Sequence, residues 1–219
     1  MTKYDLVLYD LDGTLWDSVP LILESLKKAY ETVLGGTDRT ESDLMSYIGK
    51  PLGEVFSMHE EQDKELLIEA YLEHNCARLR ENAVPIFPGV YDFLSKIKEL
   101  GIKQGVVTSK REDSAMITID LLELGGYFDI MVFREATERA KPHDDPLVEA
   151  ARRAGITDMS RVLYVGDAVP DILSARDCGA DFALVGWTKM PKNEFENLKP
   201  DYIIDIPERL SCIIKGSEL

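Results

Sequence analysis

Two aspartates, Asp10 and Asp12, lie two residues apart where an apolar stretch ends, in the segment LYDLDGTLWDS. Two carboxylates this close repel each other, and each raises the pKa of the other unless a cation compensates them. Hard divalent ions such as Mg²⁺ bind carboxylate, carbonyl and water oxygens. The pair therefore indicates a cation site at the end of the first apolar segment.

Further polar residues follow two later apolar segments. Thr108 and Ser109 come directly after IKQGVV, and Asp167 follows VLYVG, with Asp171 four residues further on. Lys141 stands before a proline, between these two segments. In open α/β sheets, ligands bind at the carboxyl edge of the strands, so these residues are expected to meet there.

The elements that would position these residues alternate between strand and helix. The predicted strands are 4–9, 102–107, 129–133, 162–165, 182–185 and 202–204, and the predicted helices between them are 91–100, 113–124, 146–154 and 170–178. Such alternation predicts right-handed βαβ units and a parallel sheet. We therefore expect an α/β fold, with a doubly wound, mostly parallel sheet in a Rossmann-like core.

An all-helical segment separates the first predicted strand from the others. A helix is predicted from Ser18, as its N-cap, to Gly35-Gly36, and residues 40–82 keep a helical pattern that begins at Thr40. Residues 83–90 (AVPIFPGV) contain proline and glycine and are expected to form a linker. We predict a core of residues 1–14 and 86–219, with residues 15–85 inserted as a helical cap.

Four motifs resemble those of the haloacid dehalogenase-like (HAD) superfamily of phosphotransferases, over the whole chain. DLDGTLWDS (10–18), VVTSK (106–110), AKPHDDP (140–146) and GDAVPD (166–171) are similar to its four signatures in order. YIGKPLGEVF (47–56) and FPGV (87–90) resemble the branch that contains phosphoglycolate phosphatases with a helical cap.

The resemblance implies a role for each matching residue. Asp10 would be the nucleophile that accepts the phosphoryl group, and Asp12 would carry the proton to the leaving oxygen and from the attacking water. Thr108 and Lys141 would bind the phosphoryl oxygens. The Mg²⁺ cofactor would be held by the carboxylates of Asp10 and Asp167 and by the backbone carbonyl of Asp12.

Other residues of these motifs have weaker support. Asp171 is expected to orient the metal ligands or Lys141. Gly13, Ser109 and Lys50 are candidates for substrate binding, because Gly13 and Ser109 stand in the strand-end motifs and Lys50 in the cap loop.

Composition excludes several classes of partner. The 219-residue chain carries 40 acidic against 25 basic residues, a formal net charge of −15, which disfavours nucleic acids and anionic membranes. Its three cysteines form no CxxC pair, which favours reduced thiols in the cytoplasm. No stretch resembles a secretory signal or a membrane span. The oligomeric state is left open.

The sequence therefore predicts a Mg²⁺-dependent phosphomonoester hydrolase, similar to phosphoglycolate phosphatases and acting on a small phosphorylated metabolite. A phosphosugar mutase of the same branch remains an alternative. A non-catalytic phospho-acceptor or binding protein is a third reading, disfavoured because the acids and the lysine are all present.

Overall fold

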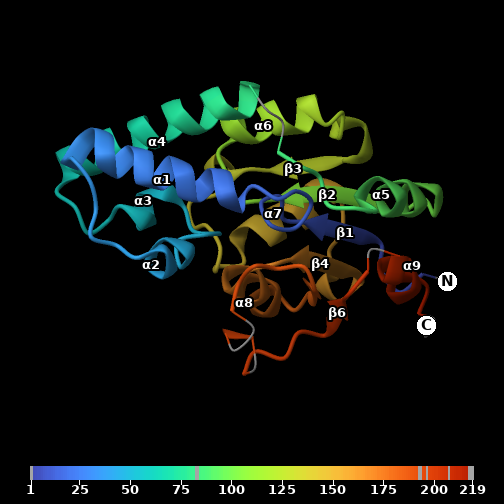
Figure 1. The fold of residues 1–219 in the computed structure, drawn as a ribbon. Coiled ribbons are helices and arrows are strands. Elements are labelled where there is room, and N and C mark those ends of the chain that lie inside the picture. Colours follow the sequence, from blue (N-terminus) through green and yellow to red (C-terminus); the bar gives the residue numbers. More distant parts are fainter. Residues whose placement is uncertain (1, 82–83, 192–193, 196, 207, 217–219) are drawn as a thin grey trace.

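Six parallel strands form one sheet in the computed structural model, which describes residues 2–81, 84–191, 194–195, 197–206 and 208–216 (Figure 1). They are β1 (Leu6–Tyr9), β2 (Lys103–Val107), β3 (Ile130–Val132), β4 (Val162–Gly166), β5 (Asp181–Val185) and β6 (Tyr202–Ile204). The strand order is β3-β2-β1-β4-β5-β6. Each predicted strand is confirmed, within one or two residues at its ends.

The first strand lies inside the sheet, between β2 and β4. In the register, Leu8 is opposite Gly105 of β2 and Tyr164 of β4. All four residues of β1 are fully buried, as expected for a strand covered on both faces. This position puts the residues after β1 at the middle of the carboxyl edge.

Helices cover both faces of the sheet. On one face, α5 (Val90–Glu99), α6 (Glu112–Leu121) and α9 (Glu208–Lys215) pack with Val7 and Tyr9 of β1. On the other face, α7 (Asp145–Ala154) and α8 (Val169–Cys178) pack with Leu6 and Leu8. Three short 3₁₀ helices lie in the connections: η1 (Gly125–Tyr127), η2 (Arg134–Ala136) and η3 (Met159–Arg161).

Four helices lie between β1 and α5 in the described part of the chain: α1 (Val19–Leu34), α2 (Glu41–Met45), α3 (Leu52–Val55) and α4 (Glu61–Glu81). Figure 1 shows α1 and α4 lying side by side, beyond the carboxyl edge of the sheet. The described part of residues 19–81 contains no strand, in agreement with the predicted helical pattern. Residues 82–83, where the linker was predicted to begin, lie outside the described residues.

Both α1 and α2 start where predicted, but only α2 has a side-chain cap. The Thr40 hydroxyl accepts a hydrogen bond from the backbone N–H of Asp43, as expected of an N-cap. Ser18 occupies the N-cap position of α1, but its side chain makes no capping bond and donates instead to Asp12, at 2.6 Å. The predicted N-cap position is therefore confirmed, but without a side-chain cap, because Ser18 has an αR backbone conformation (φ −93°, ψ −6°) and not the extended one typical of a capping residue.

The two connections between the sheet and α1–α4 run next to each other. Trp16 pairs with Ile86 as an isolated antiparallel bridge. The backbone N–H of Asp17 donates to the Pro85 carbonyl at 2.8 Å, and that of Phe87 to the Leu15 carbonyl at 3.0 Å. Within the described residues, none of the helices combines the length and the apolar character needed to cross a membrane.

Candidate active site

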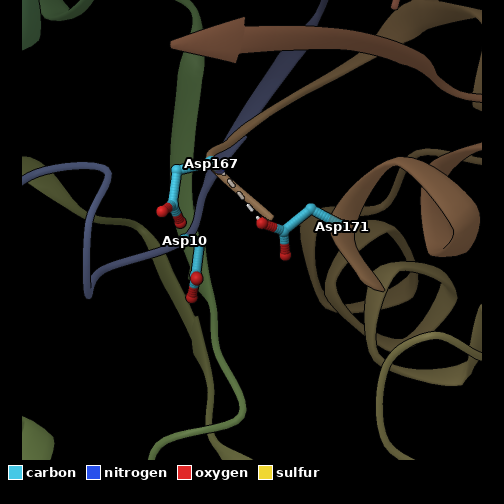
Figure 2. A group of neighbouring side chains, drawn as sticks. All are labelled: Asp10, Asp167 and Asp171. Carbon is cyan, nitrogen blue, oxygen red and sulfur yellow. Dashed lines mark hydrogen bonds between the residues drawn. The ribbon is translucent and has the colours of Figure 1, made fainter. Parts of the chain in front are cut away.

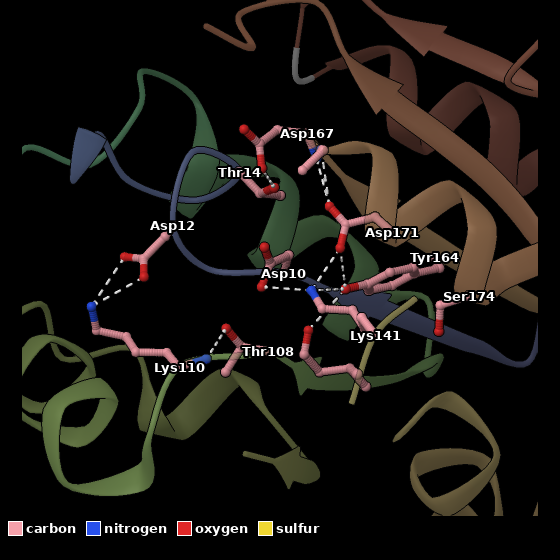
Figure 3. A network of polar contacts seen from close by, with 12 residues as sticks. Asp10, Asp12, Thr14, Thr108, Lys110, Lys141, Tyr164, Asp167, Asp171 and Ser174 are labelled. Atoms are coloured by element: carbon pink, nitrogen blue, oxygen red, sulfur yellow. Dashed lines mark hydrogen bonds and ion pairs between the residues drawn. The ribbon is translucent and has the colours of Figure 1, made fainter. Parts of the chain in front are cut away.

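The carboxyl ends of three neighbouring strands bring the predicted residues together. Asp10 follows β1, Thr108 follows β2 and Asp167 follows β4. Lys141, which lies between β3 and α7 in the sequence, reaches the same place (Figure 3). Because β2, β1 and β4 are adjacent, the convergence results directly from the strand order.

Three carboxylates form a compact buried cluster. Asp10, Asp167 and Asp171 are only 3%, 1% and 1% exposed, and each offers an oxygen within 4.8 Å of the others (Figure 2). Burial raises the pKa of Asp10 to about 6, against the attraction of Lys141 and with the repulsion of Asp171 and Asp12. Burial, followed by Asp171 and Asp10, raises the pKa of Asp167 well above its usual range. The cluster therefore has an excess of negative charge.

The ammonium group of Lys141 compensates part of that charge. Its Nζ lies 2.6 Å from Asp171 Oδ1 and 3.2 Å from Asp10 Oδ1, and it donates to the Tyr164 hydroxyl at 2.8 Å. Burial disfavours the charged form, but Asp10 and Asp171 outweigh it, so the pKa of Lys141 is raised. Lys141 thus stays cationic although its side chain is almost completely buried.

Most of the acceptor capacity of Asp171 is used by protein donors, one of which, the Tyr164 hydroxyl, also lies 2.9 Å from the Val107 carbonyl. Its Oδ1 accepts from Lys141 and from the Tyr164 hydroxyl, and its Oδ2 accepts from the backbone N–H groups of Asp167 and Ala168, at 3.1 and 3.0 Å. These donors occupy most of the lone pairs of a carboxylate. Asp171 therefore fixes Lys141 and the start of α8.

Asp10 and Asp167 differ from Asp171 in this respect. Among the described residues, Asp10 Oδ1 and Asp167 Oδ2 are buried and have no hydrogen-bond partner, although Lys141 lies at ion-pair distance from the former. Buried polar atoms are rarely left in this condition. Two such carboxylate oxygens side by side fit a hard divalent cation, which takes oxygen ligands.

Gly13 allows the chain to pass close to this pair. It has a φ of +82°, and a Cβ atom there would lie 2.3 Å from Asp167 Oδ2. The next residue, Thr14, donates through its hydroxyl to Asp167 Oδ1 at 3.4 Å. The DG turn after β1 therefore packs directly on the carboxylate that follows β4.

Asp12 points away from the cluster, toward Lys110 (Figure 3). Lys110 Nζ lies 3.0 Å from Asp12 Oδ2, and Asp12 Oδ1 also accepts from the Trp16 indole at 2.8 Å and from Ser18. Burial opposes ionisation, yet Lys110 and the two neutral donors lower the pKa of Asp12. Asp12 is thus the case in which a cation compensates the pair: Lys110 lowers its pKa, while Asp12 still contributes to the raised pKa of Asp10.

A cavity of about 470 Å³ lies between α1–α4 and the sheet edge. The predicted residues in its lining are Asp10, Asp12, Lys50, Thr108, Ser109 and Lys141. Thr108 Oγ1 accepts from the Lys110 backbone N–H, so its own proton is available for an acceptor in the cavity. Gly13, Asp167 and Asp171 do not line the cavity and lie behind it.

Sequence reasoning missed three residues of this region. Lys110 pairs with Asp12, Tyr164 bonds Lys141 and Asp171, and Arg134 lines the cavity just after β3. Lys110 and Arg134 each follow a strand that ends at the same edge, a signal that could have identified them. Tyr164 gave no such signal, since an aromatic residue within a strand usually belongs to the core.

Comparison with known proteins gives matches over most of the chain. The family profile described as haloacid dehalogenase-like hydrolase matches residues 7–185. The protein named PpaX of Caldanaerobacter subterraneus subsp. tengcongensis is 36% identical, covering 99% of this chain and 97% of its own. The pyrophosphatase PpaX of Bacillus cereus is 32% identical over 93% of each chain. A crystal structure of a haloacid dehalogenase-like protein from Bacteroides fragilis has a TM-score of 0.86 and 27% identity, over 95% of this chain and 100% of that one.

Proposed function

The chain belongs to the haloacid dehalogenase-like hydrolase family, and on that basis we propose that it hydrolyses small phosphorylated metabolites through an aspartyl-phosphate on Asp10. The observation that carries the proposal is the environment of Asp10. Its carboxylate lines the cavity, has an oxygen without a hydrogen-bond partner and lies 3.2 Å from a buried ammonium group. A nucleophile and a cation for the transferred group thus lie side by side.

In the first step, a carboxylate oxygen of Asp10 would bond to phosphorus as the bond from phosphorus to the leaving oxygen breaks. Lys141 and the hydroxyl of Thr108 would hold the phosphoryl oxygens. In the second step, water would attack the same phosphorus, which releases phosphate and restores Asp10. Asp12, held ionised by Lys110, is suited to take the proton of that water, and it would pass this proton to the leaving oxygen of the next substrate, which balances the cycle.

The residues present fit a Mg²⁺ ion. The carboxylates of Asp10 and Asp167, each with a buried oxygen that makes no hydrogen bond, would hold it together with the backbone carbonyl of Asp12, and all three are hard oxygen donors. Asp171 is not counted among the ligands, because its oxygens already accept four hydrogen bonds. When bound, the ion would offset the repulsion between these carboxylates and the phosphoryl group.

Residues 15–85 are proposed as a cap on a core of residues 1–14 and 86–219. Helices α1, α3 and α4, with the loop of residues 47–51, supply the wall of the cavity opposite the sheet. A Cβ atom added at Gly49 would lie 3.2 Å from the Ala168 Cβ, next to Asp167, so the loop between α2 and α3 lies against the core. Such a cap would exclude bulk water during the reaction and open to release product.

Inorganic pyrophosphate is the first substrate to test, because the relatives at 31–32% identity are named pyrophosphatases. Phosphoglycolate is the second, because of the sequence resemblance to that branch. Both are small enough for the cavity and carry negative charge on either side of the bond that breaks.

The decisive experiment replaces the proposed nucleophile. Asp10→Asn keeps the shape of the side chain but removes its charge, so we expect turnover of p-nitrophenyl phosphate and of pyrophosphate to fall on the order of 10³-fold or more. Phosphate release with Mg²⁺ measures it. The matched control is Asp5→Asn, just before the other end of β1, where the carboxylate pairs with Arg161 on the surface. An Asp10→Asn protein that keeps its turnover would refute the proposal.

A further inference from the structure

We propose that Arg134 and Lys50 form a second anion-binding position in the cavity, which selects substrates whose leaving group carries its own phosphate or carboxylate. This inference rests on the proposed phosphatase function and extends it to a substrate class. It assigns a binding role to a residue outside the motifs that follow β1, β2 and β4.

The cavity differs in charge from the rest of the chain. Its lining has twice as many basic as acidic residues: Lys50, Lys64, Lys110, Arg111, Arg134 and Lys141 against Asp10, Asp12 and Glu54. The whole chain has the opposite balance, with 40 acidic and 25 basic residues. A cation-rich cavity in an acidic protein indicates a ligand with more than one negative charge.

Most of these cations already have a carboxylate partner. Lys141 and Lys110 pair with Asp10 and Asp12. Lys64 pairs with Glu61 at 3.2 Å, and Arg111 pairs with Asp113 at 3.2 Å and with Glu135 at 3.7 Å. Among the described residues, Arg134 and Lys50 have no acidic partner within ion-pair distance. Their charges are therefore available to a ligand.

Arg134 is held in position by its surroundings. It begins η2 directly after β3, its backbone N–H donates to the Lys110 carbonyl at 3.1 Å, and its Nη1 donates to the Thr137 carbonyl at 3.0 Å. The side chain is half-buried, so a carboxylate or phosphate at its remaining donors would be only partly screened by water.

The strand order sets the distance of Arg134 from the reacting atoms. β3 lies two strands from β1, a lateral separation of roughly 10 Å at the usual strand spacing. A phosphoryl group at Asp10 would leave room, in the direction of Arg134, for a short leaving group with one further anion. An uncharged leaving group, or one too large for this space, would not bind the Arg134 guanidinium.

Lys50 approaches from the opposite wall. It lies in the loop between α2 and α3, next to Gly49, which contacts the core at Ala168. Its side chain is exposed and lines the same cavity. Gly49 lies near the end of β4 and Arg134 near the end of β3, on either side of β1. An anion in the cavity would be bound by both cations where the long Lys50 side chain extends toward the β3 side.

Steady-state kinetics on three substrates test this position. The substrates are pyrophosphate and 2-phosphoglycolate, whose leaving groups are anionic, and p-nitrophenyl phosphate, whose aryl group has no second phosphate or carboxylate. For Arg134→Gln we expect KM to rise about 10- to 100-fold on the two substrates with an anionic leaving group, the effect of losing a charged hydrogen-bonding partner. The kcat/KM for p-nitrophenyl phosphate should change less than about twofold. Lys50→Gln should show the same selectivity with a smaller effect, because Lys50 is more exposed.

Arg111→Gln is the matched control, because its guanidinium lines the same cavity but is already paired with two acids. It should leave the ratio of the three kcat/KM values unchanged. Retained turnover of p-nitrophenyl phosphate also shows that a variant is folded. If Arg134→Gln loses all turnover, Arg134→Lys replaces it in the test, because lysine keeps the positive charge but lacks the planar guanidinium. The ratio of its three kcat/KM values is then compared with that of the wild type.

The outcomes separate the two proposals. A selective loss on pyrophosphate alone or on phosphoglycolate alone supports the position and identifies its ligand as phosphate or carboxylate. An equal change on all three substrates, or no change, overturns it while leaving the phosphatase proposal intact. A wild-type protein that turns over none of the three refutes the proposed function and this inference with it.

Discussion

Four aspartates of the same edge have four different environments. Asp171 has most of its acceptor capacity used by hydrogen bonds, and Asp12 is paired with Lys110. Asp10 shares Lys141 with Asp171, and Asp167 has one oxygen bonded to Thr14 and one without a partner. Equal side chains thus acquire unequal properties from their neighbours, which is how one site obtains a nucleophile, a base and metal ligands.

The close approach of Gly13 to Asp167 leads to a prediction about metal binding. Gly13→Ala would place a methyl group 2.3 Å from Asp167 Oδ2 and force the carboxylate to move. We expect the Mg²⁺ concentration for half-maximal turnover to rise about tenfold or more, as when a metal ligand loses its orientation.

The control for this variant is Gly155→Ala at the end of α7. Gly155 has a similar φ of +73°, but nothing lies within 4 Å of its added Cβ. Both variants bear a backbone cost of about 1 kcal/mol in unfolding free energy. An equal Mg²⁺ requirement in the two variants would contradict the prediction.

At this scale, the sequence identified the motif residues but not their partners. Asp10, Thr108, Asp167 and Lys141 could be placed at one edge because each follows or adjoins a predicted strand. The pairing of Lys110 with Asp12 depends on the direction of a long side chain, which the types and spacing of residues do not fix. The bond from Ser18 to Asp12 was missed for the same reason, since residue types and spacing do not fix where a hydroxyl donates.

Among the elements, the paired connections between the sheet and α1–α4 are joined to the site through Trp16. Its backbone bridges Asp12 and Ile86, and its indole N–H donates to the Asp12 carboxylate. A movement of α1–α4 about this segment would therefore also displace an acceptor in the site. This arrangement links the position of the helices to that of the proposed acid–base residue.

Trp16→Phe tests this link. The substitution keeps an aromatic ring in a fully buried position and removes one donor to Asp12. We expect kcat for p-nitrophenyl phosphate to fall roughly tenfold, the effect of losing a hydrogen bond to a charged group. KM should change little, because the substrate itself loses no contact.

Trp187→Phe serves as the comparison. The Trp187 indole donates to the backbone carbonyl of Thr14 at 3.1 Å, so the same chemical change occurs away from Asp12. Its kcat should stay near that of the wild type. The link is disproved if both variants lower kcat to the same extent.

The order and type of the elements were predictable because strands and helices differ in period. A continuous apolar run such as VLYV does not have the period of an amphipathic helix and fits a buried strand. Glycines mark several helix ends. The face that α1–α4 turn toward the sheet was not predictable, because α4 has apolar and charged residues all round. The cation-rich lining depends on that face, and only the folded chain reveals it.

For the whole molecule, the buried carboxylates of the site should make the unfolding free energy depend on the bound metal. Without it, two carboxylate oxygens of Asp10 and Asp167 have no hydrogen-bond partner, so an ion that binds the folded chain should stabilise it. At 100 times its dissociation constant, such an ion contributes about 2.7 kcal/mol to the unfolding free energy. We expect Mg²⁺ to raise Tm by roughly 5–10 °C.

Thermal unfolding of the metal-free protein, with Mg²⁺ added stepwise, measures this shift without reference to turnover. Asp167→Asn should remove most of it, whereas Asp38→Asn, at an exposed position before α2, should keep it. A wild-type Tm that does not respond to Mg²⁺ would exclude the proposed ligand set.

The central position of β1 also affects how the chain acquires its shape during synthesis. β1 is made early, but its neighbours β2 and β4 begin at Lys103 and Val162, so it has no partner until much later residues leave the ribosome. The helices α1–α4 contact one another at smaller sequence separations than β1 and its neighbours, as Ser25 and Asn75 are 50 residues apart, and can form sooner. The aspartates of the site are therefore assembled late, and until then the first strand is an exposed apolar segment that a chaperone would recognise.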